Sequence, residues 1–197
     1  CAADNFHGRT TTIVSFSTEQ QYRFGFGPFT PGFRIVRYGN TDDLQKMIGP
    51  NTAAFIVEPI QGEAGIIIPP AGYLQSAAQL CKENNVLFVA DEIQTGLGRT
   101  GKLFAYEHEN VRPDVVIVGK ALGGGFYPVS AVLSSSEVLG VFHPGDHGST
   151  FGGNPLAAAV AREALKVIVE ENLVAKAQES GDYFMNRLRC IKSRHIV

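Results

Sequence analysis

The sequence predicts an α/β fold with three layers (αβα), in which helices cover both faces of a mostly parallel sheet. Residues 86–90 (VLFVA) and 115–118 (VVIV) are short apolar runs without polar alternation, which is typical of strands buried on both faces. An amphipathic helical pattern at residues 72–84 separates the first of these runs from an earlier apolar run at 53–57. This order of strand, helix and strand is that of a parallel βαβ unit.

The other predicted elements follow in chain order. Residues 21–40 are rich in glycine, proline and aromatic residues, which indicates a long ordered loop followed by a short strand at 33–38. We expect a short helix at 41–48, capped by Thr41, Asp42 or Asp43. A long helix at 155–171 should begin with Asn154 as N-cap and Pro155 as its first residue. The remaining expected elements are a short helix or turn at 103–109, a strand at 128–133, a short helix at 136–141 and a second long helix at 173–190.

Composition places the chain among globular domains and argues against several classes of partner. Its 197 residues are 44% hydrophobic and 18% charged, which allows one large core. The net charge of -2 and the lack of a basic block argue against nucleic acid, and no apolar run approaches membrane-spanning length. The three cysteines form no CxxC or cysteine–histidine pattern, so we expect reduced thiols, no bound metal and a reducing compartment.

Charged side chains follow the central predicted strands. Asp91 closes the run at 86–90, and Lys120 follows the run at 115–118. Ligands of open α/β sheets bind at the carboxyl ends of strands, so we expect these two side chains to share a site. An enzyme that uses pyridoxal 5'-phosphate needs this pair, because the lysine forms a Schiff base with the aldehyde and the aspartate keeps the pyridine nitrogen protonated.

Further polar residues extend the predicted site. Glu58 follows the run at 53–57, and Glu63 lies in the loop beyond it. Gln94, three residues after Asp91, can reach a group beside the one that Asp91 contacts. Residues 147–154 (HGSTFGGN) offer hydroxyls and backbone N–H groups suited to a phosphate.

A glycine-rich segment at residues 96–102 (GLGRTGK) suggests a different function. It fits the G-x-x-x-x-G-K spacing of a nucleotide-binding phosphate loop, but Leu103 stands where that loop needs a serine or threonine hydroxyl for magnesium. The segment also directly follows the carboxylate that ends a strand, whereas a phosphate loop comes from its own strand and opens a helix. An ATPase is therefore a disfavoured alternative.

Several short motifs are spread over nearly the whole chain. They are NFHGR (5–9), VEPIQGE (57–63), DEIQTG (91–96), GK (119–120) and HGST (147–150), supported by GFGPFTPGF (25–33), EPIQGEAG (58–65) and KALGGGFYPVSAVL (120–133). Together these motifs resemble the class III, fold-type I aminotransferases.

The resemblance implies how residues of these motifs contact pyridoxal 5'-phosphate. Lys120 would bond to the cofactor and then move the proton between the substrate and cofactor carbons. Asp91 would pair with the protonated ring nitrogen, and Gln94 would meet the ring hydroxyl. Phe6 and Ile93 would pack on opposite faces of the ring.

The resemblance also implies residues for the phosphate and the substrate. Ser149 and Thr150 would bind the phosphate, with Thr150 supplied to the site of the neighbouring subunit. Arg9 would bind a substrate carboxylate. Glu63 would pair with a family arginine that shields or exposes a second carboxylate site, and Glu58 would support the active-site loop.

The activity that the resemblance implies is transfer of the δ-amino group of L-ornithine to 2-oxoglutarate, giving glutamate-5-semialdehyde and glutamate, as in proline biosynthesis and arginine catabolism. Acetylornithine or 4-aminobutyrate as amino donor, a mutase reaction and a non-catalytic binding module remain alternatives. The resemblance further implies a homodimer with shared active sites, located in the cytoplasm, or in the mitochondrial matrix if the source is eukaryotic.

The family pattern also predicts the domain organisation. Residues 1–175 would form part of the cofactor-binding large domain, and 176–197 a helix leading toward a small C-terminal domain. The glycine-rich phosphate loop, the substrate tyrosines and the arginine partner of Glu63 would lie outside residues 1–197, and the first residue is Cys1 rather than methionine. We therefore interpret the chain as part of a longer protein and expect residues 1–197 alone to be inactive. A fully active monomer of these residues would contradict this interpretation.

Overall fold

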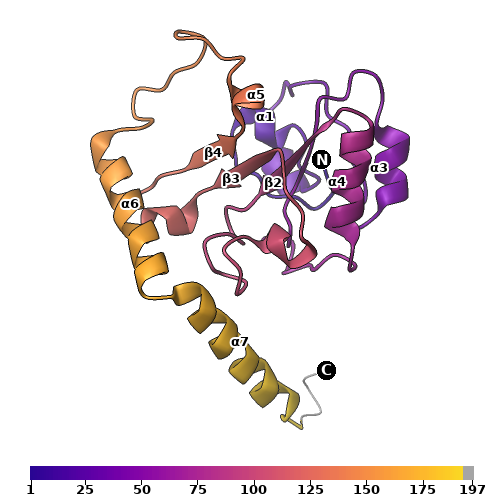
Figure 1. The fold of residues 1–197 in the computed structure, drawn as a ribbon. Coiled ribbons are helices and arrows are strands. Elements are labelled where there is room, and N and C mark those ends of the chain that lie inside the picture. The colour runs from indigo at the N-terminus through magenta and orange to yellow at the C-terminus, as the bar shows by residue number, and fades with distance from the viewer. Residues whose placement is uncertain (193–197) are drawn as a thin grey trace.

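The computed structural model describes residues 1–192 and is built around a four-stranded sheet (Figure 1). Strands β1 (Ala54–Val57), β2 (Leu87–Asp91) and β3 (Val115–Val118) are parallel neighbours, and β4 (Ala131–Ser134) pairs antiparallel with β3. The strand order is β1-β2-β3-β4. This confirms the predicted α/β fold with a mostly parallel sheet.

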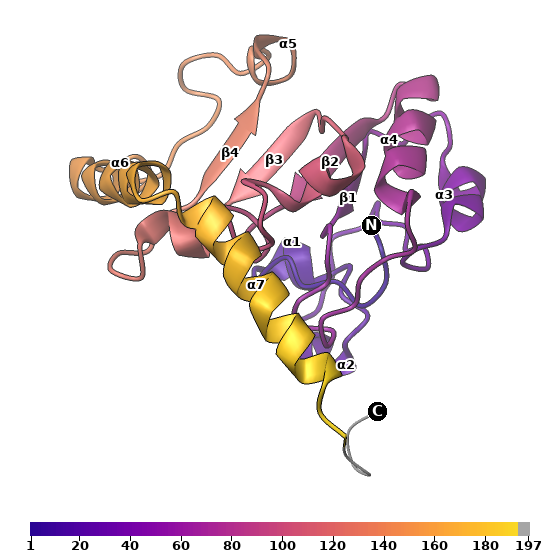
Figure 2. The same ribbon diagram turned by 60° about the horizontal axis from the view of Figure 1, so that its bottom comes forward.

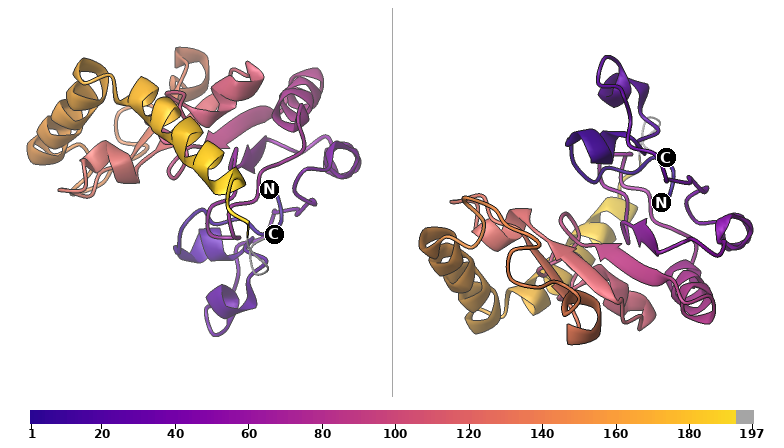
Figure 3. Two further views of the ribbon diagram at one scale, coloured as in Figure 1. Left: turned by 90° about the horizontal axis from the view of Figure 1, so that it is seen from below. Right: turned by 90° about the horizontal axis from the view of Figure 1, so that it is seen from above.

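Helices flank this sheet. α3 (Thr41–Met47) and α4 (Tyr73–Glu83) pack together, with α4 against β2, whereas α6 (Pro155–Glu170) packs on the 3-10 helix η2 (Lys120–Gly123). Figures 2 and 3 show α4 and α6 at opposite ends of the sheet. α7 (Leu173–Arg189) follows α6 and runs away from the sheet. The remaining short helices are α1 (Thr11–Val14), α2 (Gln20–Arg23), η1 (Ala105–Glu109) and α5 (Ser136–Leu139).

The core consists of two clusters of apolar side chains. The larger lies between α4 and the β1–β2 pair, where Phe55 and Phe88 are neighbours in the sheet register and Cys81 packs from the helix. The smaller contains Val116 and Val118 of β3 together with Ile168 of α6. Because apolar burial is the main favourable term in folding, these clusters fix β1, β2 and β3 side by side and align their carboxyl ends.

The helix starts follow from local hydrogen bonds. The Asn154 side chain accepts from the N–H of Ala157 at 2.9 Å and Pro155 is the first helical residue, as predicted for α6. For α3 the predicted cap is wrong. The cap is Asn40, whose side chain accepts from the N–H of Asp43 at 2.9 Å, because Thr41 is already the first residue of the helix.

The strand predicted at residues 33–38 is also wrong. Only Val36 pairs there, in an isolated parallel bridge with Ala2. The N–H of Ala3 donates to Val36 O at 2.7 Å, and the N–H of Val36 donates to Cys1 O at 3.0 Å. Within residues 1–192 the segment has no other strand beside it, so residues 33–38 cannot form the continuous backbone hydrogen bonds of a strand.

Two further predictions concern the ends of the chain and the membrane. The boundary predicted at residue 175 falls inside the first turn of α7, which begins at residue 173; the division into two domains stays a prediction.

No helix in the part of the chain that the structure describes is long and apolar enough to span a bilayer.

Candidate active site

The carboxyl ends of the three parallel strands meet around a small cavity. Asp91 is the last residue of β2, Glu58 follows β1, and Lys120 lies two residues beyond β3. The cavity has a volume of about 140 Å³ and is lined by Phe6, His7, Gly8, Glu58, Asp91, Ile93, Gln94 and Lys120. The structure therefore brings together the side chains predicted to surround one flat ligand: Phe6, Asp91, Ile93, Gln94 and Lys120.

Lys120 enters this cavity from a strained turn. It opens η2 with a φ of 43°, a left-handed conformation that is rare for a residue with a side chain. Such backbone costs about 1–3 kcal/mol and is found preferentially at functional sites. The Lys120 side chain is about half exposed (52%), and its Nζ lies 4.0 Å from Glu63 Oε1. The amine is thus at the rim of the cavity and accessible to a ligand.

Asp91 is buried at the base of the cavity and held by two partners. Its Oδ1 accepts the N–H of Ile93 at 3.1 Å, and its Oδ2 lies 2.6 Å from His7 Nδ1. An ionised carboxylate can only accept, so Nδ1 of His7 is the donor. The His7 side chain is 2% exposed, and its Nε2 has no hydrogen-bond partner within residues 1–192.

His7 is a site residue that the sequence did not identify. It belongs to the NFHGR motif, but nothing in the motif indicates that its ring faces Asp91, which is 84 positions further along the chain. The sequence offered one indication that His7 belongs to the site: it lies between Phe6, predicted to pack on the cofactor, and Arg9, predicted to bind a carboxylate.

Glu58 ties the N-terminal loop to the end of β1. It is 4% exposed, and its carboxylate accepts the N–H of Phe6 at 2.8 Å and that of Gly62 at 3.2 Å. Burial raises the pKa of Glu58, although both hydrogen bonds oppose this effect. Since one bond holds the backbone of Phe6, Glu58 fixes the aromatic wall of the cavity.

Glu92, the residue after β2, also holds a loop through hydrogen bonds to its carboxylate. It is 1% exposed, its Oε2 accepts from the Thr95 hydroxyl, and its Oε1 accepts from the N–H of Tyr106 at 2.9 Å. Burial again raises the pKa of Glu92 above its ordinary value of 4.5. The carboxylate thus anchors the loop that follows Asp91.

The raised pKa of Glu92 predicts a pH dependence of stability. The folded state holds the proton of Glu92 more tightly than the unfolded state does, so the stabilisation is fully present below pH 4.5 and is lost as pH rises through the folded pKa. In urea titrations at a series of pH values, we expect the free energy of unfolding to fall less steeply with rising pH in Glu92→Gln than in the wild type. The control Glu170→Gln, exposed on α6, should follow the wild type; identical slopes in all three proteins would contradict the prediction.

Gln94 lines the cavity and contacts Glu63, which lies outside it. Gln94 Nε2 donates to Glu63 Oε1 at 3.1 Å. The Gln94 amide lies so close to Gly62 that a Cβ at this glycine would collide with it. Gly62 thus permits the close approach of the loop after β1 to the loop after β2.

Arg9 contacts Phe6 and Tyr22, two residues that line a second, more polar cavity of about 310 Å³. Phe6 lines both cavities, and Glu63 lines the second while contacting Lys120. The Arg9 side chain is exposed, and its Cζ lies 4.2 Å from the centroid of the Tyr22 ring. A cationic group thus lies next to Phe6, which lines both cavities.

Ser149 and Thr150 lie elsewhere in the structure. Both are exposed in the loop between α5 and α6, and neither lines the cavity that contains Asp91 and Lys120. Their role in phosphate binding stays a prediction.

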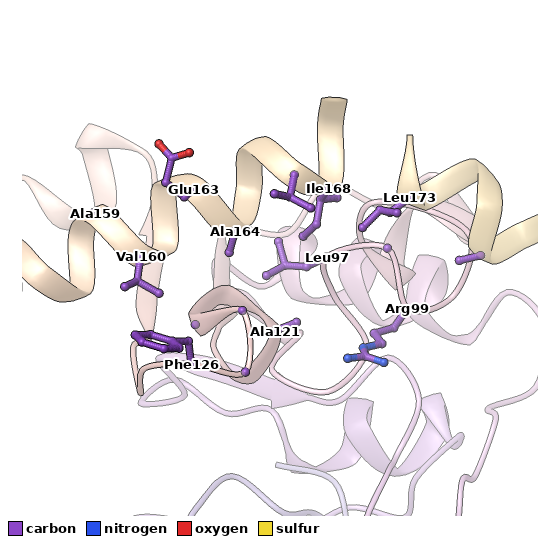
Figure 4. Close-up of a pocket in the computed structure, with 16 residues that line it drawn as sticks. Leu97, Arg99, Ala121, Phe126, Ala159, Val160, Glu163, Ala164, Ile168 and Leu173 are labelled. Carbon is purple, nitrogen blue, oxygen red and sulfur yellow. The ribbon is translucent and has the colours of Figure 1, made fainter. Parts of the chain in front are cut away.

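A separate groove lacks the aspartate and lysine of the cavity at the strand ends. It has a volume of about 880 Å³ and lies between α6, α7 and the glycine turn after η2. Figure 4 shows Val160, Ile168 and Leu97 directed into it, while the Glu163 carboxylate points away. The lining is mostly aliphatic, which suits packing rather than proton transfer. Within residues 1–192 there is also no group of three metal-ligating side chains.

The structure contradicts the nucleotide-binding alternative for residues 96–102. Gly98 packs against Val174 of α7, and the segment leads through turns to the 3-10 helix η1 rather than opening an α-helix. A phosphate loop needs the N-terminus of a following helix to bind its anion.

Comparisons with known proteins agree with this geometry. The family model "Aminotransferase class-III" matches residues 2–197. The chain is 65% identical over 187 residues to an ornithine aminotransferase of Exiguobacterium sp., covering 95% of this chain and 47% of the relative, and 58% identical over 189 residues to that of Bacillus subtilis, covering 96% and 47%. It thus spans about half the length of the curated relatives it matches.

Solved structures show the same fold. The ornithine aminotransferase from Toxoplasma gondii ME49 superposes with a TM-score of 0.94 at 50% identity, covering 95% of this chain and 45% of that one. An acetylornithine aminotransferase from Elizabethkingia anophelis superposes with a TM-score of 0.78 at 52% identity, covering 81% and 43%.

Proposed function

Because this chain belongs to the class-III aminotransferase family, we propose that the protein containing it is a pyridoxal-phosphate-dependent ornithine δ-aminotransferase. It would transfer the δ-amino group of L-ornithine to 2-oxoglutarate and release glutamate-5-semialdehyde and glutamate. The observation that carries the proposal is the buried Asp91 carboxylate facing the same cavity as Lys120, between Phe6 and Ile93. The amino donor follows from the relatives, which are ornithine aminotransferases at 58–65% identity.

The cavity residues fit pyridoxal 5'-phosphate. Phe6 offers an aromatic wall and Ile93 an aliphatic one, Asp91 offers a carboxylate and Gln94 an amide. When bound, the cofactor supplies an aldehyde that exchanges amines and a ring that withdraws electrons from the substrate carbon. A solved Toxoplasma gondii ornithine aminotransferase, 50% identical to this chain, has partial occupancy of this cofactor at its active site.

Different residues of the chain would bind and transfer the protons of the reaction. Asp91 would hold a proton on the ring nitrogen, because a carboxylate beside a pyridinium favours the charged form. His7 Nδ1 donates to Asp91 Oδ2 and keeps that carboxylate oriented. Lys120 carries the amine that would hold the cofactor and would accept or donate the proton at the substrate carbon. Gln94 would meet the ring hydroxyl.

Substrate groups outside the cofactor cavity meet Arg9 and Glu63. The guanidinium of Arg9 can bind a carboxylate with two parallel hydrogen bonds. Glu63 lies 4.0 Å from Lys120 Nζ, where it would also pair with an arginine contributed from outside residues 1–197. The arrangement lets one site accept first an amino acid and then a 2-oxo acid.

The proposal includes an assembly. Ser149 and Thr150, in their exposed loop, would bind the cofactor phosphate, with Thr150 acting in the neighbouring subunit of a homodimer. The reaction serves proline biosynthesis and arginine catabolism in the cytoplasm, or in the mitochondrial matrix of a eukaryote. The large domain would extend to about residue 175, as proposed from the family pattern.

The visible absorption spectrum of the purified protein that contains residues 1–197 tests the function. A yellow band that bleaches with L-ornithine and returns with 2-oxoglutarate would support both half-reactions. A band that responds only to acetylornithine or 4-aminobutyrate would keep the family and change the amino donor. No band, even after addition of pyridoxal 5'-phosphate, would contradict the enzyme proposal and favour a binding module.

His7→Ala should lower kcat about ten-fold with little change in KM, because partners that orient a primary ligand typically contribute ten-fold or more. His7→Asn should retain most of the activity, since its side-chain N–H can take the place of Nδ1. Steady-state kinetics with L-ornithine measure both values. Equal losses in the two variants, or a change in KM alone, would show that the contact with Asp91 does not support catalysis.

A further inference from the structure

The surroundings of Arg9 are aromatic rather than acidic. Its Cζ lies 4.2 Å from the centroid of Tyr22 and 5.5 Å from that of Phe6. Within residues 1–192 no carboxylate lies within ion-pair distance of Arg9, and its guanidinium donates no hydrogen bond. An aromatic face attracts the cation without using its N–H donors. The guanidinium group of Arg9 is therefore held in place while its N–H donors stay free to bind a ligand.

Tyr22 is itself fixed by short-range structure. It lies in α2, where the Glu19 side chain accepts the N–H of Gln21 at 3.1 Å and caps the turn. The Tyr22 ring meets the Phe6 ring edge-on, with centroids 5.7 Å apart and planes at 76°. Tyr22 also lines the polar cavity that contains Glu63. One aromatic ring thus contacts Arg9, the Phe6 wall of the cofactor cavity and the adjacent cavity.

An exposed arginine loses rotamer freedom when it binds a ligand, which weakens binding. A side chain that is already restricted in its bound orientation loses less of this freedom when the ligand arrives, and it binds more tightly for the same contacts. A ring on one side of the guanidinium also limits its position without competing with a carboxylate for hydrogen bonds.

From these contacts we infer that Tyr22 is a positioning residue, which holds Arg9 for the carboxylate of the substrate. The inference deepens the proposed function and rests on it for the identity of the substrate. Tyr22 touches neither the reacting carbon nor the cofactor in this role, so it acts on carboxylate binding and leaves proton transfer unchanged.

The test compares Tyr22→Leu and Tyr22→Phe in the holoenzyme. Without the ring, the Arg9 side chain must be ordered when the carboxylate binds, and ordering one such side chain corresponds to about a five-fold loss of affinity. In Tyr22→Leu, KM for L-ornithine and the calorimetric Kd for glutarate, an unreactive dicarboxylate, should each rise about five-fold with kcat unchanged. Tyr22→Phe keeps the ring and should stay within about two-fold of the wild type. The matched control Tyr183→Leu, at an exposed tyrosine of α7, should leave both values unchanged.

A double-mutant cycle with Arg9→Met decides whether Tyr22 acts through Arg9. In the Arg9→Met background, Tyr22→Leu should have no further effect on the Kd for glutarate. Independent effects of the two substitutions, a fall in kcat that exceeds the change in KM, or no glutarate binding by the wild type would overturn the inference. If L-ornithine is not a substrate, the proposed function fails, whereas the glutarate cycle still tests whether Tyr22 positions Arg9.

Discussion

Replacing Lys120 by alanine should reduce transamination by about 10⁴-fold or more, the largest effect expected of any single substitution in this chain. In the proposed function, the substitution removes both the amine that would bond to the cofactor and the group that would move the proton at the substrate carbon. Single-turnover measurements with L-ornithine, in the protein that contains residues 1–197, give the rate of the first half-reaction directly. The absorption band of the bound cofactor should also be lost or shifted in the variant.

The matched control is Lys102→Ala, which removes the lysine of the glycine-rich segment at residues 96–102. Lys102 does not line the cavity with Asp91, so the turnover of this variant should stay within about two-fold of the wild type, as expected of a surface substitution. Comparable losses in both lysine variants, or an active Lys120→Ala, would contradict the assignment of Lys120.

Replacing Asp91 by asparagine should lower kcat about 10³-fold, the size of loss seen when a preorganised electrostatic contact to the reacting group is removed. The amide has nearly the same shape but no charge, so it cannot stabilise a proton on the ring nitrogen. Its amide oxygen can still accept the N–H of Ile93, which the wild-type carboxylate holds at 3.1 Å, and its NH2 can donate to Nδ1 of His7 when the proton of that ring is on Nε2. The defect should therefore be one of catalysis rather than of folding.

Steady-state kinetics and thermal unfolding separate these two explanations. Asp91→Asn should unfold within a few degrees of the wild type, and the surface control Asp43→Asn should keep full activity. Asp43 pairs with Arg37 and does not line the cavity that contains Asp91. If Asp91→Asn retained normal kcat, the carboxylate would have no part in activating the cofactor.

The sequence predicted the sheet and the strand-end side chains well, for a physical reason. Strands buried on both faces need continuous apolar runs, and the end of such a run marks where the chain leaves the sheet. The run at 115–118 became β3, and Asp91 ends β2 as expected. Because parallel neighbours place their carboxyl ends together, residues as distant as Glu58 and Lys120 could be assigned to one place.

Contacts that depend on loop conformation could not be predicted in this way. His7 and Tyr22 lie in segments without periodicity, and their ring positions follow from hydrogen bonds and packing that no local pattern encodes. The strand expected at 33–38 failed for a related reason, since an apolar run becomes a strand only where a neighbour pairs with it along its length. Within residues 1–192, only Val36 of this segment has such a neighbour, Ala2.

The separation between His7 and Asp91 has a consequence for how the protein folds. The two residues are 84 positions apart, and the Phe6 and Glu58 pair is 52 apart. Contacts of this range close large loops, and we expect them to form after local helices and the first strand pairs because the loop-closure entropy must be overcome first. A chain that has not completed its sheet therefore has no cavity for the cofactor. Because a ligand that binds only the native state stabilises it by mass action, cofactor uptake would mark the end of folding and oppose its reversal.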